Sequence, residues 1–288
     1  MLVAPVARAS GQETPREPRP SQASAADTIF GRSGRLLARF FAPRRSMEVE
    51  PIARLFGHRE AKGTSTVAVT DSASGRKMSL ITLLPFGDKV NGRVGDYHIG
   101  RFPAEKRKPR SEAYENPDGF IEVTPANKDT PVSEHFRLAD FLTHDQKNVW
   151  PKYLVLREAL IDKLELVIAE LQRRGVKAQH LSIVSGFRTP EYNQKGVGRG
   201  GRARDSRHQF GDAADIVIDN NRDGRMDDLN HDGRVNAKDM RILADAVESV
   251  ERQYPELVGG LGLYRATRSR PPFIHVDTRG VRARWGRF

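Results

Sequence analysis

The hydrophobic and polar positions of this chain follow different periods in different segments, and these periods predict its elements. Apolar residues at helical spacing predict a helix over 154–171 that ends before Gly175. Its apolar face consists of Leu156, Leu160, Leu164, Val167 and Leu171. Apolar runs at 181–184 and 213–219 predict strands, and 240–250 predicts a second helix.

The segment 63–125 has a different character, because it is rich in residues that favour strands. Residues 64–70 and 78–84 predict two strands, and 97–103 predicts a short third one. We therefore expect a small β domain over 63–125, with wall binding, substrate positioning and a plain spacer as open alternatives for its role. Residues 104–118 predict a charged linker.

Residues 1–62 form a basic N-terminal segment, in which 10–27 has the composition of disordered chain. Between 29 and 41, apolar residues interleave with arginines. This pattern predicts an amphipathic helix that lies on an anionic membrane or packs on the next domain. Ala7-Arg8-Ala9 is similar to the end of a signal peptide, but the apolar stretch before it is short, which leaves the true N-terminus open.

The composition of the chain limits the number of domains, the kinds of metal site and the kinds of partner that can be expected. The chain has 288 residues, enough for one large or two modest domains, and no cysteine, which excludes disulfides and thiolate metal ligands. A net charge of +11 favours anionic partners such as wall polymers or acidic lipid. Neither a helix-turn-helix pattern nor an RNA-binding aromatic motif emerges, which makes nucleic acid an unlikely partner. The chain contains no run of twenty apolar residues.

Two motifs in the C-terminal half bring the candidate chemistry. The first is an H-x-x-G-x-A-x-D string that starts at His208 and ends at Asp215, and the second contains His275. Gly211 can turn the backbone between the first two side chains, so that both can reach one ion. Two imidazoles and one carboxylate suit a catalytic zinc, and the pair of motifs predicts a hydrolase. The alternative is a structural histidine beside a buried carboxylate.

Polar residues near these motifs are candidates for proton transfer and substrate binding. Asp277 follows His275 by two residues, close enough to orient a ligand or to handle a proton, and is the preferred general base. Asp212 and Asp205 are the substitutes if Asp277 is excluded. Arg188 follows a predicted strand and could pair with a substrate carboxylate, or it could tie the adjoining turn.

A second metal signal follows the first motif directly, within an insertion over 219–239. Two copies of D-x-N-x-D-G-x-x-[DN] begin at Asp219 and Asp228, and they overlap too closely to form two independent EF-hands. The second copy supplies oxygens at positions 1, 3, 5, 9 and 12 of a calcium loop, with glycine at position 6. An acidic surface turn is the alternative to structural calcium. The predicted ligands are Asp219, Asn221, Asp223, Asp227, Asp228, Asn230, Asp232, Asn236 and Asp239.

These motifs resemble those of the D-Ala-D-Ala carboxypeptidases and lysostaphin-like zinc peptidases, a group that includes the hedgehog signalling domain. The shared features are an S-x-H-x-x-G-x-A-x-D run and a later histidine on a strand. Within this group the chain looks most like the YcbK-like murein endopeptidases. Their S-G-[FY]-R-T-P-x-x-N segment matches residues 185–193, and their F-[IV]-H-x-D-x-G-x-x-R-x-W close is similar to residues 273–285.

The resemblance covers about residues 131–288 and implies an α+β zinc domain with an antiparallel sheet and flanking helices. It implies a periplasmic or extracellular peptidase acting on peptidoglycan, either a carboxypeptidase or an endopeptidase, with Arg188 and Ser206 binding substrate. Many relatives carry an acidic residue or a second histidine just before the last ligand, where this chain has Pro272 and Phe273. That departure favours the alternative of an inactive, metal-stabilised wall-binding module.

Overall fold

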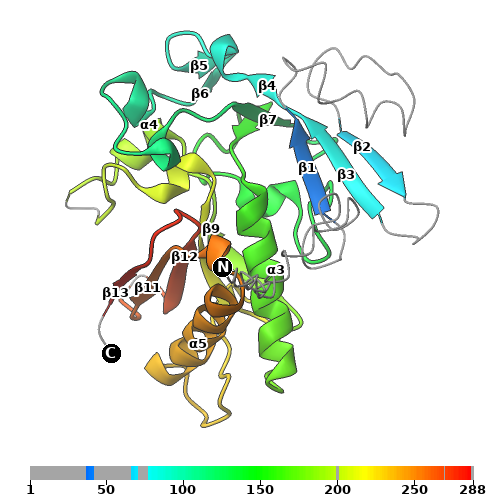
Figure 1. The fold of residues 1–288 in the computed structure, drawn as a ribbon, viewed down its shortest axis with the longest axis vertical. Helices are drawn as coiled ribbons and strands as arrows, with labels where there is room; N and C mark the ends of the chain where they lie inside the picture. Colours follow the sequence, from blue (N-terminus) through cyan, green and yellow to red (C-terminus); the bar gives the residue numbers. More distant parts are fainter. Residues whose placement is uncertain (1–36, 42–65, 71–76, 199–200, 269, 287–288) are drawn as a thin grey trace, which may run out of the picture.

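The structure is a computed structural model of the chain, and it describes residues 37–41, 66–70, 77–198, 201–268 and 270–286. It combines α-helices with mostly antiparallel sheets, as the predicted α+β class requires (Figure 1). Within these ranges, no helix is both long and apolar enough to cross a membrane.

A five-stranded sheet forms the centre of the C-terminal part, in the order β13-β11-β12-β10-β9. All neighbours in it are antiparallel except β11 and β13, which are parallel. Strands 181–184 and 213–219 were predicted at nearly these positions. The bounds are Leu181–Ser185 for β9, Ala213–Ile218 for β10, Gly260–Tyr264 for β11, Phe273–Asp277 for β12 and Ala283–Trp285 for β13.

Two long helices, α3 (Glu158–Arg173) and α5 (Ala237–Gln253), pack against each other, and α5 also packs against β11 and β12. Both helix predictions are confirmed. The first begins later than expected, because Leu154 belongs to β8 (Lys152–Leu154) and pairs with Ile121 of β7 (Gly119–Val123). A short helix, α4 (Pro190–Gln194), follows β9 and is capped by the Thr189 side chain, which accepts a hydrogen bond from the Tyr192 amide.

The remaining strands form three smaller sheets. One sheet combines β1 with β3 and β2, another combines β4 with β7 and β8, and β5 pairs with β6. The bounds are Leu37–Phe41, Thr66–Thr70, Lys77–Thr82, Leu84–Pro85, Arg93–Val94, Tyr97–His98, Gly119–Val123 and Lys152–Leu154 for β1 to β8. The 3-10 turns are Phe86–Asp88, Pro103–Glu105, Glu112–Tyr114, Leu138–Phe141, Arg207–Phe210 and Pro255–Leu257.

The N-terminal predictions have mixed outcomes. The strands expected at 64–70 and 78–84 are confirmed as β2 and β3. The amphipathic helix expected over 29–41 is wrong for residues 37–41, which form β1 and pair in parallel with β3. Residues 29–36, the segment 10–27 and Ala7–Ala9 lie outside the described residues.

The described part of 63–125 does not stand apart from the rest of the chain. Phe102 packs edge-on against Phe210, with ring centroids 6.3 Å apart, and the Glu191 amide donates to the Ile99 carbonyl at 3.0 Å. Buried residues from both segments belong to one continuous core. The expected linker 104–118 contributes as well, because Arg207 donates a hydrogen bond to the Ala113 carbonyl.

Candidate metal centre

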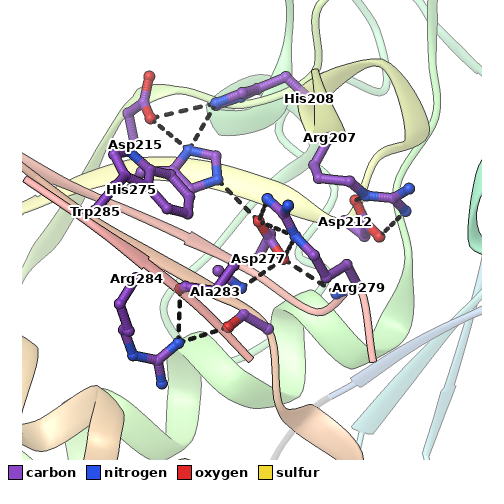
Figure 2. Close-up of polar contacts among 12 residues, drawn as sticks. Arg207, His208, Asp212, Asp215, His275, Asp277, Arg279, Ala283, Arg284 and Trp285 are labelled. Carbon is purple, nitrogen blue, oxygen red and sulfur yellow. Dashed lines mark hydrogen bonds and ion pairs between the residues drawn. The ribbon is translucent and has the colours of Figure 1, made fainter. Parts of the chain in front are cut away.

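The central sheet brings the predicted metal ligands together. Asp215 of β10 lies directly opposite His275 of β12 in the antiparallel register. His208 comes from the 3-10 turn before β10, which ends at Gly211 in a left-handed conformation. All three side chains are buried, and they point toward one another (Figure 2).

The three candidate ligand atoms form a nearly equilateral triangle. His275 Nδ1 lies 3.1 Å from His208 Nε2 and 3.0 Å from Asp215 Oδ1, and the His208–Asp215 pair is 3.2 Å apart. Ligand atoms about 2.0–2.1 Å from a tetrahedral zinc ion are about 3.3 Å from one another. The spacing and the donor types therefore fit three positions of a tetrahedral ion. Among the described residues, this is the cluster of histidine and acidic side chains that could hold a metal ion.

The hydrogen bonds of His208 prepare it as a ligand. Its Nδ1 lies 2.7 Å from the Gly186 carbonyl, which can only accept, so Nδ1 carries the proton and Nε2 has the free lone pair. Burial lowers the pKa of His208 to about 4, which outweighs the attraction of Asp215. The imidazole is therefore neutral at neutral pH, the form that binds a metal.

Asp215 and His275 each shift the pKa of the other. Burial alone would raise the pKa of Asp215, but His208 and His275 hold it well below its usual range. Burial alone would lower the pKa of His275, but its hydrogen bonds to Asp215 and Asp277 raise it. The carboxylate of Asp215 is thus ionised and available as a ligand.

The contacts of Asp277 favour an orienting role over its predicted role as general base. Its Oδ2 lies 3.1 Å from Nε2 of His275, on the ring edge opposite to Nδ1, which faces the other two ligands. Arg279 binds the same carboxylate through Nε and Nη2, and the Gly260 amide donates to it at 2.8 Å. These bonds outweigh burial and lower the pKa of Asp277. Asp277 therefore orients His275, as carboxylates beside metal-bound histidines do.

Three glycines of the run 259–262 lie next to Asp277 and Trp285. The sequence motifs did not identify them as part of the site, although a run this rich in glycine indicates a close approach of other groups to the backbone. A Cβ atom at Gly260 would lie 2.3 Å from Asp277 Oδ2, and one at Gly262 would lie 2.2 Å from the Trp285 ring. At Gly259 it would meet the Asp277 carbonyl. The glycines thus let the Asp277 carboxylate and the Trp285 ring lie directly on β11, with Trp285 5.1 Å from the His275 ring.

The other predicted site residues also have protein partners. Arg188 donates to Asp215 Oδ2 at 2.5 Å and to Ser185 at 2.9 Å, so it holds the second oxygen of this candidate ligand carboxylate. It also lines the cavity beside the cluster, as Ser206 does. Asp212 pairs with Arg207, and Asp205 pairs with Arg107 and Arg110. Neither Asp212 nor Asp205, the alternative candidates for the general base, is therefore a free carboxylate.

A cavity of about 1040 Å³ opens beside the cluster, and His208, Asp215 and His275 contribute to its wall. Aromatic rings form one part of this wall. Tyr264 stacks on Phe273 with centroids 4.7 Å apart, and its hydroxyl accepts a hydrogen bond from Trp285. The cavity is large enough for a peptide segment to reach the metal ligands.

The position of Gly211 leads to a prediction for stability. Gly211 has φ of 70°, and a Cβ there would lie 2.4 Å from the Val155 backbone. Gly175 has φ of 77° but open space around it, which makes it a matched control. We expect Gly175→Ala to lower the free energy of unfolding by about 1 kcal/mol and Gly211→Ala by about 3 kcal/mol, as measured by urea denaturation. Equal losses would show that the close approach at Gly211 is unimportant.

The two acidic loops close through the same pattern of hydrogen bonds. Asp219 accepts hydrogen bonds from the amides of residues 223 and 224, and Asp228 accepts from those of 232 and 233. Asp239 is fully buried and caps α5, accepting from the Leu229 and Asn236 amides. Calcium binding would require several of these carboxylates to turn toward one point, and it stays a prediction.

Calcium is expected to raise the melting temperature of the zinc-loaded protein. An ion that binds only the folded state adds about 2.7 kcal/mol at a hundredfold excess over its Kd. Asp228→Ala combined with Asp232→Ala should abolish this rise and leave the zinc content unchanged. Scanning calorimetry after chelation and zinc reloading tests the prediction, and identical melting with and without millimolar calcium would refute it.

Comparisons with known proteins leave the site to be interpreted from its own geometry. No family model matches the chain, and neither the curated proteins nor the solved structures include a match. The metal cluster and the cavity beside it are therefore the observations from which a function can be inferred.

Proposed function

We propose that the protein is a zinc-dependent peptidase that hydrolyses peptide bonds in peptidoglycan stem peptides or crosslinks. The observation that carries the proposal is the convergence of His208, Asp215 and His275 on the wall of a peptide-sized cavity. The resemblance of residues 131–288 to D-Ala-D-Ala peptidases and murein endopeptidases supports it. Both carboxypeptidase and endopeptidase activity fit the site, in a periplasmic or extracellular setting.

Zinc held by these three side chains would supply Lewis-acid polarisation of the scissile carbonyl and activation of water. Neighbouring residues hold the three candidate ligands in position. Asp277 fixes the His275 ring, and Arg188 fixes the Asp215 carboxylate. Trp285 lies beside the His275 ring, with the two ring centroids 5.1 Å apart. Arg188 also lines the cavity, where its positive charge can stabilise negative charge on substrate.

Peptide hydrolysis also needs a proton acceptor, and His144 is our candidate. It lines the same cavity, and its Nε2 lies 2.8 Å from the Val184 carbonyl. Because a carbonyl only accepts, the proton is on Nε2 and the lone pair is on Nδ1. Val184 directly precedes Ser185, which pairs with Asp215 across the sheet. His144 and the three candidate ligands thus line one cavity, which supports its role as the proton acceptor.

The experiment that tests the proposal is digestion of purified peptidoglycan by the zinc-loaded protein. Mass spectrometry should detect released stem peptides, shortened stems or free D-alanine. His208→Ala should release nothing, and His144→Gln should retain zinc but release fragments at least a hundredfold more slowly. Undiminished release by His144→Gln would exclude His144 as the base, and absence of release by the native protein would contradict the peptidase proposal.

The alternative, a metal-stabilised wall-binding module without catalysis, is favoured by the absence of an acidic residue at 272 and 273. It makes a different prediction in the same experiment. The zinc-loaded protein would sediment with insoluble peptidoglycan and release no fragments. Sedimentation together with release supports the peptidase.

A further inference from the structure

The cavity beside the metal cluster has a strongly uneven charge. Among the described residues, its wall includes eight arginine and lysine side chains but only two carboxylates, those of Asp205 and Asp215. A concave surface with one dominant sign of charge concentrates its field on whatever enters. The basic side chains are Arg110, Arg188, Lys195, Arg202, Arg204, Arg207, Arg270 and Arg279.

Half of these cations are already paired with carboxylates. Arg188 pairs with Asp215, and Arg279 pairs with Asp277, so both serve the metal ligands. Arg110 and Arg207 pair with Asp205 and Asp212. No ion pair with a carboxylate of the described residues involves the other four, which we call the cationic rim: Lys195, Arg202, Arg204 and Arg270.

Arg202 of the cationic rim is fixed in place. Its guanidinium stacks on the Tyr192 ring, 4.2 Å from the centroid, and donates to the Tyr192 carbonyl at 2.5 Å. Its backbone amide donates to Gly196, where a Cβ would collide with the Arg202 side chain at 2.4 Å. A fixed guanidinium loses little entropy when it binds an anion, so it makes a better subsite than a mobile side chain.

We propose that the cationic rim binds carboxylates of the substrate away from the scissile bond, and so selects stem peptides with free carboxylates over amidated ones. This inference rests on the proposed peptidase function. Guanidinium and carboxylate groups match in charge and in hydrogen-bond geometry. Amidation removes the charge but changes the size of the peptide very little, which isolates the electrostatic contribution.

The test uses two soluble stem peptides that differ only in the D-glutamate α-carboxylate, free in one and amidated in the other. We expect kcat/KM of the zinc-loaded protein to be about tenfold higher for the free acid and to fall with added salt. Arg202→Gln combined with Arg204→Gln should reduce the preference to about twofold. Arg241→Gln combined with Arg252→Gln removes the same charge from exposed positions of α5 and should leave the preference unchanged.

Calorimetric binding of the same two peptides to the zinc-loaded protein separates this inference from the peptidase proposal. Binding that favours the free acid and depends on Arg202 and Arg204 supports the subsite even if no bond is cleaved. Cleavage of both peptides with equal efficiency by native and variant protein would overturn the subsite but leave the peptidase proposal standing. Tighter binding of an oligonucleotide of equal charge would also overturn it.

Discussion

Alanine in place of His208 or His275 is expected to remove both the metal and the activity of the protein. Each imidazole supplies one of the three candidate ligand atoms found among the described residues, which lie 3.0–3.2 Å from one another. Loss of one leaves two side-chain ligands, too few for a catalytic zinc site. Peptidoglycan hydrolysis should fall below detection, and the zinc content measured by mass spectrometry should fall from about one per chain to near zero.

His180→Ala is the matched control, because this half-buried histidine lies outside the cavity. It should retain both zinc and hydrolysis. Full zinc occupancy in His208→Ala or His275→Ala would contradict the assignment of the ligands. Circular dichroism of each variant distinguishes a lost metal site from a lost fold.

Asparagine in place of Asp277 is expected to weaken zinc binding by about 10–100-fold, because Asp277 orients His275. It should also lower the free energy of unfolding by about 3–5 kcal/mol, since Arg279 would keep a charge without its buried partner. Competition with a chelator measures the zinc affinity. At saturating zinc, most of the hydrolysis should return.

The return of hydrolysis at saturating zinc distinguishes a positioning role of Asp277 from a catalytic one. A general base at Asp277 would give the opposite pattern, with normal zinc affinity and a loss of turnover of about a hundredfold that zinc cannot restore. Asp245→Asn on the exposed side of α5 removes an equal charge and should change neither property. Undiminished zinc affinity in Asp277→Asn would refute the positioning role.

The sequence predicted the parts of the fold that depend on local patterns. The helical spacing from Leu156 to Leu171 predicted α3, and the apolar run before Asp219 predicted β10. The cluster that could hold a metal ion was also predictable, because the H-x-x-G-x-A-x-D string places His208 and Asp215 around one glycine turn. His275 then completes the cluster across the sheet from Asp215.

The remaining features depend on contacts between distant residues, which local patterns do not encode. The spacing of His275 and Asp277 fits either a base or an orienting carboxylate, and only Arg279 and the close approach at Gly260 decide between them. The segment 63–125 has strand patterns of its own, so its packing through Phe102 onto Phe210 could not be foreseen. The arginines interleaved with apolar residues over 29–41 fitted a helix, but pairing with β3 makes residues 37–41 a strand.

Zinc-edge X-ray absorption on the reconstituted protein tests the central claim most directly, since it reports both the ion and its ligands. We predict about one zinc per chain, with two imidazole nitrogens and carboxylate oxygen at about 2.0–2.2 Å, in a four-coordinate site. His275→Ala should lose this signature. A protein that retains no zinc after dialysis, or a six-coordinate zinc surrounded by oxygen alone, would contradict the account.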